Sequence, residues 1–278
     1  MDPTRINAVE GQLELLENLF AATRRARGIE MAFEPLPLLL PGGGFPPELL
    51  DLLSTAETAE LSRLRIPKRR RDWLGGRLAA KAAALRLLQR AGLSLEPSEI
   101  EILKQDSGEP ALRLSRPPRA ASERIARPLE APDGVEVTIS HSGDLAAAAA
   151  WRRGSTGSIG LDIEQVRPVE PEIVPIALTS GEIRRIELAA TEQERTRLIL
   201  SLWTVKEAAL KAAGVGLSVA LQALEVVPGP ECGNWTVRLD SRDGTHPTRE
   251  FLVETSIAAG YVVSLAVSCT GASETHPR

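Results

Sequence analysis

A strict alternation of apolar and polar residues marks the stretch IGLDIE near the middle of the chain. Ile159, Leu161 and Ile163 share one face of the strand that this period of two predicts. We expect that face to meet the core, so that Asp162 and Glu164 lie together on the opposite face. Their Cα atoms would then be about 6.6 Å apart, which lets both carboxylates reach one divalent cation.

A helical pattern follows in the stretch LWTVKEAALKAAGVGLS. Trp203, Glu207 and Lys211 recur at intervals of four residues, so they form one stripe of a helix, with Lys206 beside it. This combination suits a metal-bridged polyphosphate, because the acid binds the cation and the lysines meet the phosphate oxygens. We expect Trp203 to pack in the core and Gly214 to end the helix.

The remaining hydrophobic periods predict helices and short strands on both sides of these stretches. Helices are expected over residues 9–27, 48–64, 72–92, 179–190 and 192–213. Strands are expected over residues 100–103, 111–114, 135–139, 145–150, 224–227, 235–239, 250–255 and 261–268, with a short strand and a Gly/Pro turn within 34–47. Alanine favours a helix at 145–150, but the flanking strand patterns favour a strand there. Each half of the chain thus combines helices with a small antiparallel sheet.

Composition narrows the class of protein. The 278 residues carry a net charge of −4 and 43% hydrophobic side chains, enough to bury one large core or two medium ones. Two cysteines are too few for a disulfide framework, and no Cys/His cluster predicts zinc. The N-terminus has no apolar signal-peptide core, and no apolar run approaches the roughly 20 residues that span a bilayer. We therefore expect a soluble cytoplasmic protein without a membrane partner.

One basic stretch, RLRIPKRRR at residues 63–71, contrasts with this mild acidity. Such a run is typical of nucleic-acid binding, of a solvated helix start or of a phosphate site. Aromatic residues are only 3% of the chain and none lies among these cations, which argues against nucleic acid. If the following helix lines a site, we expect Arg71 and Arg77 to touch an anionic substrate. Gly75 and Gly76 in this helix predict close approach of a ligand or of another backbone.

Several motifs, taken in order, resemble those of the 4′-phosphopantetheinyl transferase family, in its larger form that activates carrier proteins of peptide, polyketide and fatty-acid synthases. The motifs are RRRDWLGGRLAAK (69–81), SGEPAL (107–112), TISHSGD (138–144), IGLDIEQVRP (159–168), LWTVKEAALKAAGVGLS (202–218) and GYVVSLAV (260–267). The sequence departs from the family pattern at Glu109, where lysine is usual, and at Pro168, which comes one residue early. We give Glu109 no role.

The resemblance implies an α/β (α+β) pseudo-dimer, in which each half is a small, mainly antiparallel sheet packed with helices and the active site lies between the halves. We place the halves at residues 1–157 and 158–278. The reaction implied is Mg²⁺-dependent transfer of the 4′-phosphopantetheine arm of coenzyme A to a serine of an apo acyl or peptidyl carrier protein, with release of adenosine 3′,5′-bisphosphate. A chain holding both halves needs no partner to complete the site, so a monomer is expected.

The same resemblance assigns roles to individual residues. Asp162, Glu164 and Glu207 would bind the metal, and Glu207 or a water bound to the metal would accept the serine proton. Lys211 would contact a phosphate oxygen at the reacting centre. His141 would contact a phosphate of coenzyme A, and we include it among the catalytic residues. The other candidates for coenzyme A binding are Ser140, Arg71, Arg77, Lys68, Arg69 and Lys206. Of these, Lys206 is either a phosphate contact or an outward-pointing lysine.

Carrier proteins of this kind are acidic helical bundles, so their docking surface should be basic and partly apolar. We expect it within residues 182–200, which hold Arg184, Arg185, Arg195 and Arg197.

Two other functions compete with this interpretation. Another Mg²⁺-dependent phosphoryl or nucleotidyl transferase would share the carboxylates and lysines, although the sequence has no phosphate-binding loop. A catalytically silent protein that binds coenzyme A or carriers would not need Asp162, Glu164, Glu207 and Lys211 all in place. The choice between Mg²⁺ and Mn²⁺, the carrier protein served, and the roles of residues 1–60 and 116–132 stay open.

Overall fold

The computed structural model describes residues 3–105, 108–115, 134–155, 157–240 and 248–269. Segment 116–132, to which no role was given, therefore lies outside the described residues. The chain divides into an N-terminal unit, Ala22–Ser155, and a C-terminal unit made of Thr156–Arg278 together with Met1–Ala21. The predicted halves, 1–157 and 158–278, differ from these units in two respects: the boundary lies two residues earlier, and the first 21 residues group with the C-terminal unit.

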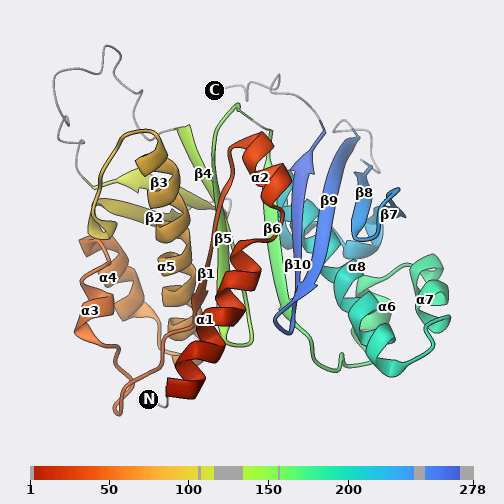
Figure 1. The fold of residues 1–278 in the computed structure, drawn as a ribbon, viewed down its shortest axis with the longest axis horizontal. Helices are drawn as coiled ribbons and strands as arrows, with labels where there is room; N and C mark the ends of the chain where they lie inside the picture. Colours follow the sequence, from red (N-terminus) through yellow and green to blue (C-terminus); the bar gives the residue numbers. More distant parts are fainter. Residues whose placement is uncertain (1–2, 106–107, 116–133, 156, 241–247, 270–278) are drawn as a thin grey trace. The chain divides into compact units, whose positions relative to one another are not determined.

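The N-terminal unit is built on a five-stranded antiparallel sheet with the strand order β1-β5-β4-β3-β2 (Figure 1). Its strands are β1 (Glu30–Pro35), β2 (Ile100–Lys104), β3 (Pro110–Leu114), β4 (Val135–Ser142) and β5 (Leu145–Arg152). Its helices are α2 (Ala21–Arg27), α3 (Pro47–Leu50), α4 (Thr55–Arg63) and α5 (Pro67–Arg90), with a 3-10 turn η1 (Pro97–Glu99). The long helix α5 lies against β1, β5 and β4.

The C-terminal unit repeats this plan with the strand order β6-β10-β9-β8-β7. Its strands are β6 (Ile159–Gln165), β7 (Leu224–Pro228), β8 (Asn234–Leu239), β9 (Arg249–Ala258) and β10 (Tyr261–Ser268). Its helices are α1 (Pro3–Glu17), α6 (Val174–Ala177), α7 (Ser180–Glu187) and α8 (Glu192–Ala213), with 3-10 turns η3 (Gly216–Ser218) and η4 (Leu221–Ala223). The long helix α8 lies against β6, β10 and β9, and α1 contacts β9.

In each unit one strand leads through a long helix into a four-stranded meander, and the last strand of the meander pairs with that first strand. The prediction of an α+β chain with two similar halves, each a small antiparallel sheet packed with helices, is confirmed. No sequence repeat revealed this duplication, which is visible in the order and pairing of the strands.

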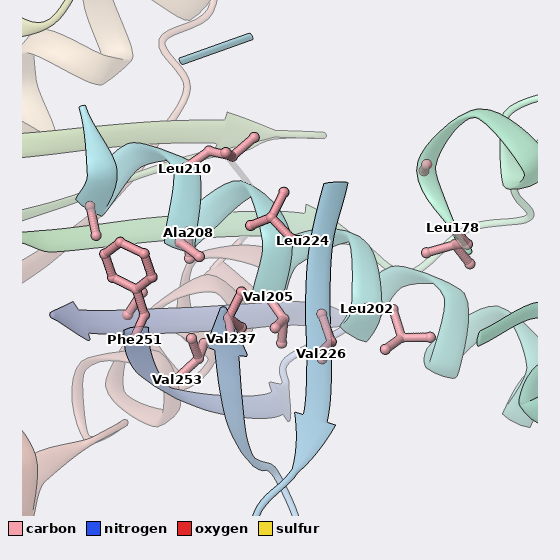
Figure 2. Close-up of a cluster of buried hydrophobic side chains, with 14 of the residues drawn as sticks. Leu178, Leu202, Val205, Ala208, Leu210, Leu224, Val226, Val237, Phe251 and Val253 are labelled. Atoms are coloured by element: carbon pink, nitrogen blue, oxygen red, sulfur yellow. The ribbon is translucent and has the colours of Figure 1, made fainter. Parts of the chain in front are cut away.

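The core of the C-terminal unit forms where α8 covers the sheet. Figure 2 shows Val205 and Ala208 of α8 facing Val237, Phe251 and Val253 of the strands. These side chains are at most 1% exposed. Burial of each valine or phenylalanine side chain contributes roughly 1.5–3 kcal/mol to the free energy of folding. Helix α8 has the predicted bounds and packs Trp203 against this core, as expected.

The ends of α8 follow from local chemistry. Thr191 caps the first turn through a reciprocal capping box with Glu194, which satisfies two backbone N–H groups that a helix otherwise leaves unpaired. Gly214 adopts a left-handed conformation with φ of 69° and ends the helix, as predicted.

The alanine-rich segment forms strand β5. The strand predicted from the flanking patterns is therefore confirmed, and the helix that alanine favours does not form. Ala146 and the four alanines after it are fully buried, because β5 lies between β1 and β4 with α5 against it. Gly75 and Gly76 of α5 allow close packing against side chains of the same unit, whereas we had expected close approach of a ligand or of another backbone. A Cβ atom on Gly75 would lie 2.3 Å from Leu36 Cδ2, and one on Gly76 would lie 2.9 Å from Ile139 Cγ2.

Two predicted helices are each broken in two. The helix expected over 9–27 separates into α1 and α2 around Phe20, whose φ of 56° is left-handed and cannot continue a helix. The helix expected over 48–64 separates into α3 and α4, because Ser54 takes an extended conformation and caps α4 with Glu57. Strand β1 begins at Glu30, four residues before the expected strand segment, and the Gly/Pro turn follows it.

Among the described residues, no helix has both the length and the apolar character that crossing a bilayer requires.

Candidate functional site

The polar face of β6 lies under helix α8, contrary to the prediction that it faces away from the core. An added Cβ atom on Gly160 would stand 1.9 Å from the carbonyl oxygen of Ala208 and 2.6 Å from the amide nitrogen of Ala212. Only glycine permits this approach, and Asp162 points to the same side two residues later, 4% exposed. The close contact at Gly160 thus brings the carboxylates of β6 beneath α8.

Lys211 of α8 joins this face directly. Its Nζ donates to Asp162 Oδ1 at 2.8 Å and to the carbonyl oxygen of Leu161 at 3.1 Å. An ammonium group has three N–H donors, so two hold the strand and one is left for a further acceptor. The Lys211 side chain is 26% exposed, which allows such an acceptor to reach it.

Glu207 lies on the same side of α8, one turn before Lys211. Burial raises the pKa of Glu207, the nearby charges of Asp162 and Glu164 raise it further, and Lys211 opposes them. These influences show that the three predicted carboxylates of β6 and α8 share one neighbourhood in the C-terminal unit. Repulsion among them favours a bound cation.

The chemistry of this donor set fits a hard divalent cation, since carboxylate oxygens are the ligands that Mg²⁺ and Mn²⁺ prefer. The side chains as they stand do not converge on one point, however. Across the described part of the chain, no group of three or more His, Cys, Asp or Glu side chains is arranged to hold a metal ion. Lys211 holds Asp162 Oδ1 at 2.8 Å, so a metal ion would share this carboxylate with the ammonium group.

Lys206 is buried inside the C-terminal unit, so its predictions as a phosphate-binding residue or an outward-pointing lysine are both wrong. The side chain is fully buried, with Nζ 2.6 Å from Glu182 Oε2 and 3.1 Å from the carbonyl oxygen of Ala177. Burial lowers the pKa of Lys206 while Glu182 opposes that shift. Lys206 therefore ties α8 to α6 and α7.

The basic residues of the N-terminal unit gather at the start of α5. Arg71 donates to Asp144 Oδ1 in the turn between β4 and β5, three residues after His141. His141 is exposed and Ser140 is buried, both near the end of β4. The structure thus brings Arg71 close to the turn that follows β4. Ser140 and His141, the residues of β4 predicted to bind coenzyme A, lie in the same unit.

The other predicted phosphate contacts of α5 differ in accessibility. Lys68 is 80% exposed and pairs with Asp72 at 2.5 Å, and Arg69 is exposed. Arg77 is buried, with its guanidinium over the Trp73 ring at 4.6 Å, so it is the least accessible of the four arginines and lysines predicted there. Lys68, Arg69 and Arg71 remain the accessible candidates.

The duplication shows that the carboxylate cluster belongs to one unit only. Arg86 lies five residues after Lys81 on α5, and Lys211 lies five residues after Lys206 on α8. Arg86 and Lys211 are therefore equivalent residues of the two units, and each binds the first strand of its own unit. Arg86 donates to the Met31 carbonyl at 2.7 Å, as Lys211 does to the Leu161 carbonyl.

In this alignment Ala32 takes the place of Asp162 and Ala82 that of Glu207, while Glu34 corresponds to Glu164. The N-terminal unit thus keeps the helix-to-strand contact without two of the three carboxylates.

Sequence reasoning missed two acidic partners. Glu182 forms the buried pair with Lys206, and the capping-box pattern Thr-x-x-Glu at the start of α7 could have placed it at that helix terminus. Asp144 binds Arg71 from a turn, and no local pattern pairs residues so far apart in the chain.

Part of this chain is similar in sequence to known proteins. Residues 158–266, from β6 into β10, match the family model of the 4′-phosphopantetheinyl transferase superfamily. The 4′-phosphopantetheinyl transferase HetI of Nostoc sp. is 28% identical over 66% of this chain and 68% of its own. The 4′-phosphopantetheinyl transferase Sfp of Bacillus subtilis is 29% identical over 48% of this chain and 49% of its own.

Among solved structures, the holo-[acyl-carrier-protein] synthase of Thermotoga maritima gives a TM-score of 0.33 at 22% identity, over 41% of this chain and 63% of that one. This structural overlap adds nothing to the similarity found by sequence. The matched segment contains Asp162, Glu164, Glu207 and Lys211, the residues that the fold gathers beneath α8. Over residues 158–266, which hold all four of these side chains, the chain is similar to the 4′-phosphopantetheinyl transferase superfamily.

Proposed function

We propose that this protein transfers the 4′-phosphopantetheine arm of coenzyme A to a serine of an apo acyl or peptidyl carrier protein. The observation that carries the proposal is the group of Asp162, Glu164 and Glu207 with Lys211 across β6 and α8, within the segment that matches the superfamily. A pyrophosphate substrate calls for a divalent cation and for a lysine at the reacting phosphate. The three carboxylates of this group are ligands for the cation, and Lys211 is the lysine.

In the reaction, the serine Oγ attacks the phosphorus next to the pantetheine arm, and the P–O bond of the pyrophosphate breaks. Adenosine 3′,5′-bisphosphate leaves with the electron pair of that bond. When bound to Asp162, Glu164 and Glu207, Mg²⁺ would supply Lewis-acid stabilisation of the pyrophosphate charge. The remaining N–H of Lys211 donates to a phosphate oxygen on which negative charge grows.

The serine proton goes to Glu207, directly or through a water. In the N-terminal unit, Arg71 and His141 are proposed to bind phosphates of coenzyme A, with Lys68 and Arg69 nearby.

Intact-mass spectrometry of an apo carrier protein tests this function. Incubation with the protein, coenzyme A and Mg²⁺ should add the mass of one phosphopantetheine arm to the carrier, and EDTA should abolish the gain. Coenzyme A binding without transfer to several unrelated carriers would favour the silent binding protein. Absence of coenzyme A binding would contradict both.

Arg71 provides a separate test of nucleotide binding. Replacing Arg71 with alanine removes a charge-assisted hydrogen bond to the 3′-phosphate, so the KM for coenzyme A should rise about tenfold. Dephospho-coenzyme A lacks that phosphate, and its KM should be unchanged in the variant. Equal effects on both substrates in steady-state kinetics would place Arg71 elsewhere.

A carrier-docking surface is proposed around α7. Arg184 is exposed there, Arg185 lies 5.9 Å over the Trp235 ring, and the neighbouring Ile176 and Leu188 are 69% and 84% exposed. A basic and partly apolar surface of this kind complements an acidic helical partner.

Reversing the charge of both arginines, Arg184→Glu with Arg185→Glu, should raise the KM for the carrier about tenfold or more and leave the KM for coenzyme A unchanged. The matched control reverses two exposed charges of the N-terminal unit, Lys104→Glu with Arg113→Glu. A carrier KM that responds equally in both variants would reflect net charge alone and contradict docking at α7.

A further inference from the structure

The buried pair of Lys206 and Glu182 holds α8 against its neighbours in a fixed rotation. Glu182 Oε2 accepts a hydrogen bond from Lys206 Nζ at 2.6 Å. The same oxygen accepts from the Thr179 backbone N–H at 2.8 Å, which closes the capping box of α7. Lys206 Nζ also donates to the Ala177 carbonyl oxygen at the end of α6. One ammonium group thus binds α8 to two other helices.

A second polar contact fixes α8 on its sheet side. The hydroxyl groups of Thr204 and Ser264 lie 2.8 Å apart, and Ser264 pairs with Asp162 in the register of β10 and β6. Successive helical residues point about 100° apart around the axis. With Thr204 held toward the sheet and Lys206 held toward α6 and α7, the direction of Glu207 is set.

We propose that the Lys206–Glu182 pair is a positioning element that aims Glu207 at the carboxylates of β6, an inference that rests on the proposed function. Neither residue of the pair touches substrate; both act through the rotation of α8. The pair therefore matters for the site because Glu207 is the residue that follows Lys206.

The N-terminal unit contains the same ion pair without a carboxylate beside it. Lys81 of α5 lies 2.7 Å from Glu57, which closes a capping box with Ser54 at the start of α4. Lys81 also donates to the carbonyl oxygens of Pro97 and Ile100, as Lys206 does to that of Ala177. The residue after Lys81 is Ala82, so this pair serves the fold only.

The duplication supplies a matched control for the experiment. Lys206→Met with Glu182→Gln removes one ion pair while the amide oxygen can still close the capping box. Lys81→Met with Glu57→Gln does the same in the N-terminal unit, and it also disturbs the hydrogen bond from Ile102 N–H to Glu57. Replacing both partners leaves no buried charge without its counter-ion, so both variants should fold.

Two measurements separate positioning from stability. Mn²⁺ affinity, measured by electron paramagnetic resonance with Mn²⁺ alone, should fall about tenfold in Lys206→Met/Glu182→Gln, and kcat should fall similarly with the KM for coenzyme A unchanged. The control variant should keep both within about twofold, as expected of residues that do not support a site. Melting temperatures should change to a similar extent in the two variants.

Unchanged Mn²⁺ affinity in the first variant, or an equal loss in the control, would overturn the proposal, as would a wild-type protein that binds no Mn²⁺. If the wild type binds Mn²⁺ but transfers nothing, the proposed function fails, and the Mn²⁺ affinities of the variants still decide the positioning role. If the double variant does not fold, Glu182→Asp is compared with Glu57→Asp. Weaker Mn²⁺ binding in Glu182→Asp alone supports the proposal, and equal affinities overturn it.

Discussion

Replacing Gly160 with alanine is expected to destabilise the C-terminal unit by about 3 kcal/mol or more, because the new Cβ atom would overlap helix backbone that cannot move aside alone. The nearest atom is the carbonyl oxygen of Ala208, 1.9 Å away, and the amide nitrogen of Ala212 follows at 2.6 Å. The whole of α8 would have to shift away from β6, which also displaces Glu207 and Lys211. Urea unfolding and the transfer assay should therefore both register the change.

Gly181→Ala is the matched control for this prediction in the same unit. A Cβ atom at Gly181 would meet only atoms 3.9 Å away, and the residue lies in the first turn of α7. Because alanine favours a helix over glycine by roughly 1 kcal/mol, this variant should be as stable as the wild type or more so. Equal stability of Gly160→Ala and wild type would show that α8 is not held against β6 as described.

Glu207→Gln is expected to lower kcat roughly a hundredfold while the protein stays folded. Loss of one carboxylate from the metal-binding group removes about 3 kcal/mol of charge stabilisation at the transition state, and each 1.36 kcal/mol is a factor of ten in rate. Glu192→Gln, the same change at an exposed position of α8, should leave kcat unaffected. The measurement is the initial rate of carrier modification at saturating coenzyme A.

The stability of Glu207→Gln distinguishes a chemical loss from an unfolded enzyme. The pKa of Glu207 is raised in the folded state, so above the unfolded-state pKa the ionised group costs stability, and that cost disappears as the pH falls and the group is protonated. An uncharged glutamine avoids this cost at neutral pH. The melting temperature should therefore be equal to or higher than that of the wild type, and a large decrease would contradict the described neighbourhood of Glu207.

The sequence allowed the fold class and the composition of the carboxylate group to be predicted, because both depend on local periods. The pattern from Trp203 to Lys211 placed Glu207 and Lys211 on one stripe, and the structure keeps them together. The alternation around Asp162 identified the strand correctly. Its orientation could not be read from the alternation, because both faces of β6 are buried and the decisive contact is the approach of α8 to Gly160.

Other features required tertiary pairing that no local pattern contains. A lysine on a helix is usually solvated, and only the burial of Glu182 against it explains why Lys206 points inward. The contact of Arg71 with Asp144 likewise joins the start of α5 to a turn between distant strands. Phe20 broke a continuous helical period through its backbone conformation, which its side chain does not reveal.

The division of the chain has a consequence for protein synthesis. The N-terminal unit is one continuous segment, Ala22–Ser155, so its sheet can form on the ribosome before the rest has been translated. Helix α1 precedes the N-terminal unit in the chain but groups with β9, which is translated after that unit. Until then Leu16, which is fully buried in the finished protein, has no partner from its own unit. Helix α1 therefore docks only after the whole N-terminal unit has been made, and during that interval Leu16 is open to chaperones.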